Sequence, residues 1–379
     1  MRGIIGLIML AGLTSLLAGG RGLGNSPKRE IFKRHKGTIG ERVFQPPLAG
    51  QIVDYTANSG TDRRIWSAAL GQKRDLYVYL PPGFHPQQRY PVMIWMHGLW
   101  EDEGTFFQHP ALRDFDNAMA SGQLPPMIIA VPDGSLKGRP SIQDGTLWYN
   151  SLEGNFEDFL VQDVWGFVQQ NYPVRPERQA HVLAGISGGA GAAFRMGIRY
   201  RNMFGVAMGT HPPLNIRWVD CHGNYFSDFN PSCWGWRTSV DHGLEPVGRF
   251  YGVLVVRLRR VVYPLFGKGP EAMAKIIENN PIEMIDATRL KDGELAMYVA
   301  YAGKDEFNIT AQVDSFLYRA RQRQLKVTVD FDPQGHHDWT TADRLRPAMI
   351  QWLAEQMVPF RPQALEVNPR GQLLPTVGR

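Results

Sequence analysis

Short apolar runs that alternate with amphipathic helical patterns are the feature that most limits the fold of this chain. Phe156, Phe159, Leu160, Val164 and Phe167 recur at helical spacing, and helical patterns also follow Ser187 and cover 311–323 and 341–356. Near-continuous apolar strands separated by such helices predict an α/β fold, with a mostly parallel central sheet and helices on both faces. The predicted strands are Leu76–Leu80, Val92–Met96, Met127–Val131, His181–Ala184, Ala296–Tyr301 and Lys326–Phe331.

Residues 212–285 interrupt this alternation. They follow a further predicted strand that ends near His211, and they contain three tryptophans and the apolar run 251–262. An insertion after a strand of such a sheet emerges at the carboxyl edge, where the ligand sites of these sheets lie. We therefore expect residues 212–285 to form a lid-like or cap-like insertion over the site. The alternative is a structural flap packed against the body.

The ends of the chain differ in composition from its centre. Residues 1–20 join one positive charge to a short apolar run and small residues, which is typical of a secretory signal peptide, with an uncleaved N-terminal anchor as the alternative. Residues 21–50 are predicted to be a linker, 51–357 the main folded domain and 358–379 an irregular tail. These patterns favour a secreted or periplasmic protein, or one anchored to a membrane by its N-terminal segment.

The net charge and the two cysteines bear on what the protein binds and on how it is cross-linked. The formal net charge is +5 without a long basic run, which argues against nucleic acid as a partner. Arg257, Arg259 and Arg260 lie within an apolar run, so a peripheral membrane contact stays open. The only two cysteines, Cys221 and Cys233, are close in sequence. In an exported chain they predict one disulfide, and two separate buried thiols are the alternative.

The segment Gly185–Gly189 fits the pattern G-x-S-x-G around Ser187. It follows an apolar strand and precedes a helix rich in small residues. In this context the pattern is typical of the nucleophile elbow of α/β-hydrolases, a sharp turn that holds the serine in strained dihedral angles. An ordinary glycine-rich turn is the alternative. We expect Ser187 to be the nucleophile.

A serine hydroxyl needs a base to accept its proton, and this fold runs serine, acid, then histidine along the chain. His337 lies in a loop after the last predicted strand, with His336 as its competitor. Asp305 follows the strand that ends near Tyr301 and is the expected acid. The weaker candidates are Glu306 and Asp286.

A tetrahedral intermediate needs backbone N–H donors for its oxyanion. The N–H of Gly188 follows the nucleophile, and the loop after the second predicted strand offers the N–H of Leu99. We expect His97, in the same loop, to be structural. Metal-dependent hydrolysis through His336, His337 and Asp338 is an alternative with poor ligand spacing, so no metal and no cofactor are expected.

Several motifs together resemble the esterase family typified by esterase D, which includes feruloyl and acetylxylan esterases, S-formylglutathione hydrolase, enterochelin esterases and bacterial mycolyltransferases. The resemblance covers about 60–210 and 295–356 and implies an α/β-hydrolase fold, acyl-ester chemistry without a cofactor, and a triad at Ser187, Asp305 and His337. The chain departs from the family at Gly188, where methionine is common, and in its larger, more aromatic insertion. The matching motifs are Tyr79–Phe84, Arg89–Val92, His97–Gly98, Gly185–Gly189, Gly303–Asp305 and His337–Trp339.

The expected function is that of a serine carboxylester hydrolase that forms an acyl-enzyme on Ser187. Its expected substrate is an acylated carbohydrate or a similar small-molecule or glycan-linked ester. One alternative is acyl transfer to a sugar or lipid hydroxyl, which shares the first chemical step. A non-catalytic binding protein on a hydrolase scaffold is disfavoured because every triad position is filled.

Overall fold

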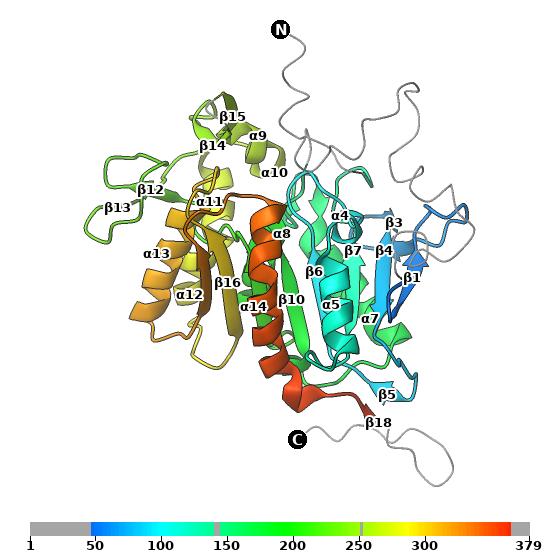
Figure 1. The fold of residues 1–379 in the computed structure, drawn as a ribbon. Helices are drawn as coiled ribbons and strands as arrows, with labels where there is room; N and C mark the ends of the chain where they lie inside the picture. Colours follow the sequence, from blue (N-terminus) through cyan, green and yellow to red (C-terminus); the bar gives the residue numbers. More distant parts are fainter. Residues whose placement is uncertain (1–46, 140–144, 251–252, 365–379) are drawn as a thin grey trace.

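The computed structural model describes residues 47–139, 145–250 and 253–364, and its centre is an eight-stranded sheet (Figure 1). The second strand in the order below pairs antiparallel with both of its neighbours, and all other neighbouring strands pair in parallel. The expected mostly parallel sheet is confirmed. The order across the sheet is β1 (Gln51–Tyr55), β4 (Leu76–Leu80), β7 (Ile128–Pro132), β6 (Val92–Met96), β10 (His181–Ile186), β11 (Val206–Thr210), β16 (Ala296–Ala302) and β17 (Thr328–Asp332).

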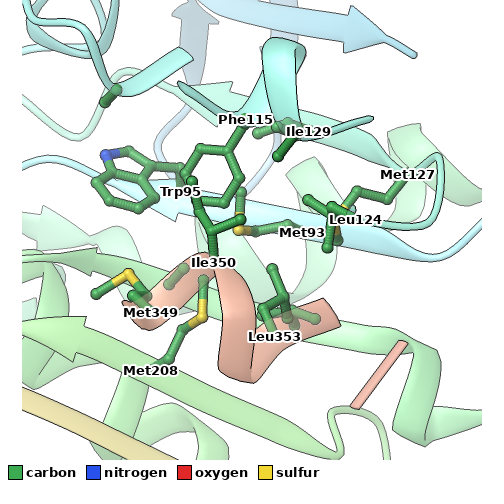
Figure 2. Packing of buried hydrophobic residues seen from close by; sticks show 14 of the residues in the cluster. Met93, Trp95, Phe115, Leu124, Met127, Ile129, Met208, Met349, Ile350 and Leu353 are labelled. Atoms are coloured by element: carbon green, nitrogen blue, oxygen red, sulfur yellow. The ribbon is translucent and has the colours of Figure 1, made fainter. Parts of the chain in front are cut away.

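Both faces of the sheet are buried, and β6 shows why its sequence is apolar throughout. Met93 and Trp95 belong to the core on one face, whereas Ile94 and Met96 belong to the core on the other. Successive side chains of a strand point to opposite faces, so a strand covered on both sides has no polar position. Figure 2 shows the first of these cores, where Trp95 and Met93 meet Phe115.

Helices cover both faces, as predicted. The first core is closed by α5 (Ala111–Ala120) and α14 (Trp339–Met357). The opposite face is covered by α6 (Phe156–Asp158), the π-helical turn η1 (Phe159–Val164), α7 (Trp165–Asn171), α8 (Gly188–Arg199), α12 (Pro281–Ala287) and α13 (Ile309–Gln322). Helix α12 lies within the predicted insertion, but Ile282 and Ile285 pack in the same core as α8 and α13. By its packing α12 therefore belongs to the body.

We call residues 212–280 the inserted segment. Figure 1 shows its elements gathered at one end of the sheet. Its elements are β12 (Trp218–Asp220), β13 (Trp234–Trp236), β14 (Pro246–Phe250), β15 (Leu254–Arg257), α9 (Leu258–Val261), α10 (Tyr263–Phe266) and α11 (Gly269–Glu278).

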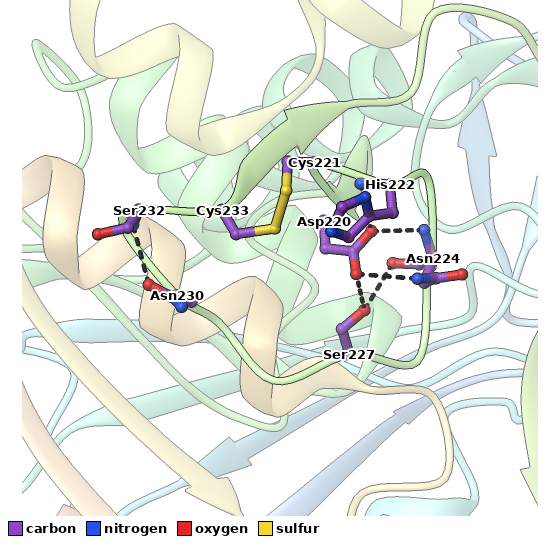
Figure 3. Close-up of a disulfide and its surroundings, with 8 residues drawn as sticks. All are labelled: Asp220, Cys221, His222, Asn224, Ser227, Asn230, Ser232 and Cys233. Carbon is purple, nitrogen blue, oxygen red and sulfur yellow. Dashed lines mark hydrogen bonds between the residues drawn. A yellow bond between two sulfur atoms is a disulfide. The ribbon is translucent and has the colours of Figure 1, made fainter.

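The expected disulfide between Cys221 and Cys233 is present in the inserted segment (Figure 3). Beside it, the Asp220 carboxylate accepts hydrogen bonds from the backbone of His222 and Asn224 and from the Ser227 hydroxyl. The turn that starts this loop is therefore held by a carboxylate as well as by the disulfide.

The C-terminal part of the described chain is more regular than an irregular tail. Residues 363–364 pair with β5 (Gln88–Arg89), and Arg175 donates to the Gln363 side chain. The predicted signal peptide and linker, up to residue 46, lie outside the described residues. In the described ranges, no helix combines the length and apolar character that a bilayer crossing requires. The remaining short elements are β2 (Ile65–Ser67), β3 (Gln72–Arg74), α4 (Thr105–Gln108), β8 (Asn150–Ser151), β9 (Gly154–Asn155), η2 (Arg178–Ala180), η3 (Val358–Phe360) and β18 (Gln363–Ala364).

Candidate active site

Ser187 occupies a strained turn between β10 and α8. Its backbone has φ 52° and ψ −122°, a region that a residue with a side chain rarely adopts. A Cβ atom at Gly185 or Gly189 would lie 2.5 or 2.2 Å from the Met96 carbonyl oxygen. Glycine at both positions is therefore needed for the turn to pack against the end of β6, which gives the G-x-S-x-G pattern its physical reason.

The structure brings Ser187, His337 and Asp305 into one hydrogen-bonded chain. His337 Nε2 lies 2.8 Å from Ser187 Oγ, and His337 Nδ1 lies 2.7 Å from Asp305 Oδ2. With its proton on Nδ1, the imidazole donates to the carboxylate and accepts the serine hydroxyl. This arrangement can move the hydroxyl proton to Nε2 as the serine oxygen attacks a carbonyl carbon.

The neighbouring candidates are engaged elsewhere. The exposed His336 ring faces Glu306, with Nδ1 2.7 Å from Oε1, and the other Glu306 oxygen accepts the His337 backbone N–H at 2.9 Å. Glu306 thus fixes the turn so that only the second histidine faces Ser187. Asp286 is ion-paired with Arg319 and Arg323 on the surface.

The two charges of the triad stabilise each other. Burial alone would lower the pKa of His337, but the charge of Asp305 and its hydrogen bond raise that pKa above its usual value. Burial would likewise raise the pKa of Asp305, yet the facing imidazole of His337 holds it below its usual range. Asp305 is therefore a carboxylate at neutral pH and can stabilise a protonated His337.

Backbone donors hold the buried Asp305 carboxylate in place. Its Oδ1 accepts the N–H of Phe307 at 2.9 Å and that of Ile309, the first residue of α13, at 3.3 Å. A carboxylate is stabilised at the N-terminus of a helix, where unpaired N–H groups and the helix dipole favour negative charge. Its other oxygen is left for His337.

His211 is a site residue that the sequence did not reveal, since it appears there only as the end of a strand. Its side chain is fully buried, its φ is 54°, and its Nδ1 lies 3.8 Å from Asp305 Oδ2. The ring centroid is 5.0 Å from that of His337. Burial, together with the adjacent His337, lowers the pKa of His211 to about 4. The neutral imidazole of His211 thus packs beside His337 and Asp305 without competing for the proton that they share.

Leu99 and Gly188, the two residues predicted as oxyanion donors, lie next to each other beside Ser187. A Cβ atom at Gly188 would lie 3.6 Å from the Leu99 nitrogen and 2.3 Å from a methyl carbon of Leu147. A side chain at position 188 would therefore displace the end of the Leu147 side chain.

A half-buried carboxylate that the sequence analysis missed fixes the loop that carries Leu99. Glu101 accepts the Gly98 N–H at 2.8 Å through one oxygen and the Trp339 indole N–H at 2.8 Å through the other. Burial raises the pKa of Glu101. The side chain links the loop after β6 to the first residue of α14, two positions beyond His337. No local motif marks it, because its partners are distant in sequence.

His97 stabilises the same loop from the other side. Its Nδ1 lies 2.9 Å from the Gly98 carbonyl oxygen, and its Nε2 accepts the Gly134 N–H at 2.9 Å. The Trp148 indole N–H donates to the His97 carbonyl oxygen. Both ring nitrogens are thus used in holding turns together.

One group of side chains that lie close enough together to hold a metal ion overlaps the chain of Ser187, His337 and Asp305. His211, Asp305 and His337 place ligand atoms within 4.8 Å of one another, but Asp305 and Ser187 use both ring nitrogens of His337. Asp338, from the metal alternative in the sequence, caps α14 by accepting the Thr341 N–H at 2.8 Å.

A cavity of about 840 Å³ lies over Ser187. Ser187, His337 and Leu99 line it from the body, and β14, β15, α9 and α10 of the inserted segment supply much of its remaining wall. The Phe250 ring of β14 packs edge-on against Phe307, with centroids 5.2 Å apart, and Phe307 packs on His337 at 4.9 Å. The inserted segment thus shields the imidazole from solvent.

Comparisons with known proteins agree with this geometry. The family described as "Putative esterase" matches residues 67–355. The chain is 27% identical over 172 residues to an endo-1,4-beta-xylanase/feruloyl esterase of Xylanibacter ruminicola, an alignment that covers 42% of this chain and 23% of that protein. The chain therefore spans about a quarter of the length of this relative.

Solved structures share the fold at low sequence identity. A ferulic acid esterase superimposes with a TM-score of 0.59 at 18% identity, covering 82% of this chain and 99% of that one. A fluorophosphonate-binding serine hydrolase of Staphylococcus aureus gives 0.55 at 15% identity, covering 80% and 98%. The family match spans most of the described chain, and the sheet, elbow and helices agree with it, so this chain belongs to the esterase family and has the α/β-hydrolase fold.

Proposed function

We propose that this protein is a serine carboxylester hydrolase with Ser187 as nucleophile, His337 as general base and Asp305 as the acid that orients it. The observation that carries the proposal is the chain of two hydrogen bonds, 2.8 and 2.7 Å long, from Ser187 Oγ through His337 to Asp305. Ser187 sits at a strained elbow, and Ser187 and His337 line a cavity large enough for an ester.

In the first half of the reaction Ser187 Oγ attacks the ester carbonyl carbon while its proton passes to His337 Nε2. The carbonyl oxygen becomes an oxyanion, for which the N–H groups of Leu99 and Gly188 are the proposed donors. The C–O bond to the alcohol then breaks, and His337 returns its proton to the departing alkoxide. The products are a free alcohol and an acyl ester on Ser187.

In the second half water replaces the alcohol. His337 accepts a proton from a water molecule as the water oxygen attacks the acyl carbon. The second tetrahedral intermediate then collapses with the Ser187 oxygen as leaving group, and His337 returns the proton to that oxygen. The carboxylate of Asp305 stabilises the imidazolium in both halves. The overall change is one ester and one water to one acid and one alcohol.

The proposed alcohol part is a carbohydrate or a similar small alcohol. Support comes from the partial match to a relative described as an endo-1,4-beta-xylanase/feruloyl esterase. Substrate choice is proposed to depend on the inserted segment, because it supplies much of the cavity wall.

The test compares Ser187→Ala with wild type on 4-nitrophenyl acetate and on a fluorophosphonate probe. Loss of the nucleophile of a triad costs about 10⁶ in rate, so the variant should lose both hydrolysis and labelling. Ser121→Ala is the matched control, because Ser121 is an exposed serine at the end of α5. A folded Ser187→Ala protein that keeps a tenth of wild-type activity would refute the assignment.

A further inference from the structure

The part of the cavity built by the inserted segment has an aliphatic wall. Val247 and Val256 face inward from the hairpin β14–β15, and Leu258 and Leu265 come from α9 and α10. All four side chains belong to one buried cluster and are at most 8% exposed. Leu147 of the body also lines the cavity and packs against the same cluster.

The outward face of the same hairpin has a different character. Val255 is 41% exposed, and Arg257 is exposed as well, whereas Val256 between them is buried. The strand therefore alternates between exposed and buried side chains, although the exposed Val255 and Arg257 also border the cavity. Its inward side is apolar because it faces the cavity interior.

Several buried polar groups of the cavity are already paired, whereas Arg259 and Arg260 border the cavity from exposed positions. Arg237 forms an ion pair with Glu245. The Tyr225 hydroxyl donates to the Phe307 carbonyl oxygen and accepts from the Gln312 amide. Among the described cavity residues, the buried side-chain atoms without a hydrogen-bond partner are Gln312 Oε1 and the ring nitrogens of His211. Both residues lie on the body, in α13 and directly after β11.

We propose that this aliphatic wall binds the acyl part of the ester, and that the acyl group is an unsubstituted alkyl chain of octanoyl length or longer. A cavity of about 840 Å³ lies in the upper part of the range for ligand pockets, far above what an acetyl group fills. A phenol or hydroxyl on the acyl group would lose its hydration against Val247, Val256 and Leu258 without a partner, which is costly. The inference rests on the proposed function, because it takes the acyl carbon to be at Ser187.

The wall predicts a chain-length dependence. Each methylene group that moves from water to this wall should raise kcat/KM by up to about four-fold. We expect kcat/KM to rise from 4-nitrophenyl acetate through butyrate to octanoate, by at least about 100-fold overall. Methyl ferulate should be a poorer substrate than methyl octanoate.

Two variants test the wall itself. Val247→Trp should fill the cavity and lower the octanoate-to-acetate ratio of kcat/KM at least ten-fold. Val256→Ala removes two methyl carbons from the same wall and should lower that ratio by up to about fifteen-fold, which keeps the test sharp if the tryptophan variant fails to fold. Val253→Trp and Val253→Ala are the matched controls, since Val253 is 73% exposed at the same hairpin and does not line the cavity.

A wild-type ratio below ten-fold, a preference for methyl ferulate, or ratios unchanged in the folded Val247 and Val256 variants would each overturn the inference. Failure of the proposed function is a separate result. If wild type hydrolyses no ester, the acyl wall is judged by calorimetric binding of dodecanoate to Ser187→Ala. Binding that is lost with Val247→Trp added but kept with Val253→Trp supports the wall, and no binding overturns it.

Discussion

Asn308 joins the inserted segment to the loop that carries Asp305, and its replacement should impair the triad from a distance. Its side-chain N–H₂ donates to the backbone oxygens of Tyr225 and Ser227, at 2.5 and 3.1 Å. Its backbone is left-handed, with φ 52° and ψ 37°. Glycine adopts that conformation freely but lacks the amide, whereas alanine lacks the amide and is strained there.

The two variants separate the two effects. Two hydrogen bonds at about 1 kcal/mol each make Asn308→Gly about 2 kcal/mol less stable. Asn308→Ala should lose about 1 kcal/mol more, the cost of the left-handed backbone. If the whole 2 kcal/mol were lost in the transition state alone, kcat would fall about thirty-fold. We expect about ten-fold, because Arg249 N–H still donates to the Glu306 oxygen and the Tyr225 hydroxyl to the Phe307 oxygen.

The assay is kcat on 4-nitrophenyl acetate, its pH profile, and the free energy of unfolding. If Asp305 moves away from His337, the apparent pKa of the base should fall, which a purely structural defect would not cause. Asn171→Gly is the matched control, because Asn171 also donates through its amide, to Phe167, on a helix outside the cavity. A folded Asn308→Gly protein with lower stability but unchanged kcat and pH profile would refute the coupling.

Four further results are expected. The rate should rise with pH as His337 loses its proton, and the midpoint should lie above the ordinary histidine pKa of about 6.5, because Asp305 raises the pKa of His337. Asp305→Asn should lower this midpoint and reduce kcat by about 10⁴. A pH profile that the variant leaves unshifted would contradict the prediction. His337→Ala should abolish ester hydrolysis, whereas His336→Ala should lower the steady-state rate much less. If His336→Ala instead caused the larger loss of rate, His336 would be the base. The Cys221→Ser/Cys233→Ser variant opens a loop with sequence separation 12 and should lose about 3 kcal/mol of unfolding free energy. An unchanged denaturation curve would show that the disulfide does not stabilise the fold. Glu101→Gln should slow acylation about ten-fold by loosening the Leu99 loop, because the glutamine amide has one acceptor oxygen where the carboxylate has two. A pre-steady-state burst at the wild-type rate would refute this role of Glu101.

Much of this protein could be predicted from the sequence because the relevant signals are local. The apolar runs at β4, β6, β7, β10, β16 and β17 correspond to observed strands, since a strand buried on both faces must be apolar at successive positions. The glycines beside Ser187 reflect a turn whose close contacts are local to β6, β10 and α8. The disulfide was predicted from two cysteines close in sequence.

Other features depended on residues far apart in the chain. His336 and His337 are adjacent and chemically alike, and the choice between them depends on Glu306, about thirty positions earlier, which binds the first ring and the backbone of the second. Glu101 and His211 carry no motif, because their neighbours Trp339 and Asp305 are brought to them only by the packing of α14 and α13.

The role of the inserted segment shows the same division. The sequence by itself determined that residues 212–285 interrupt the alternation of strands and helices, because the break in apolar periodicity is local, and it predicted that they emerge at the carboxyl edge of the sheet. Only the tertiary structure decided that this segment forms hydrogen bonds with the loop after Asp305. Arg249 N–H and the Tyr225 hydroxyl donate to that loop, and the Tyr225 and Ser227 carbonyl oxygens accept from the Asn308 side chain. Each of these hydrogen bonds has a backbone carbonyl as acceptor, and a carbonyl group is the same at every residue, so the sequence does not mark where the contact is made. The segment expected as a lid thus also supports the loop after Asp305.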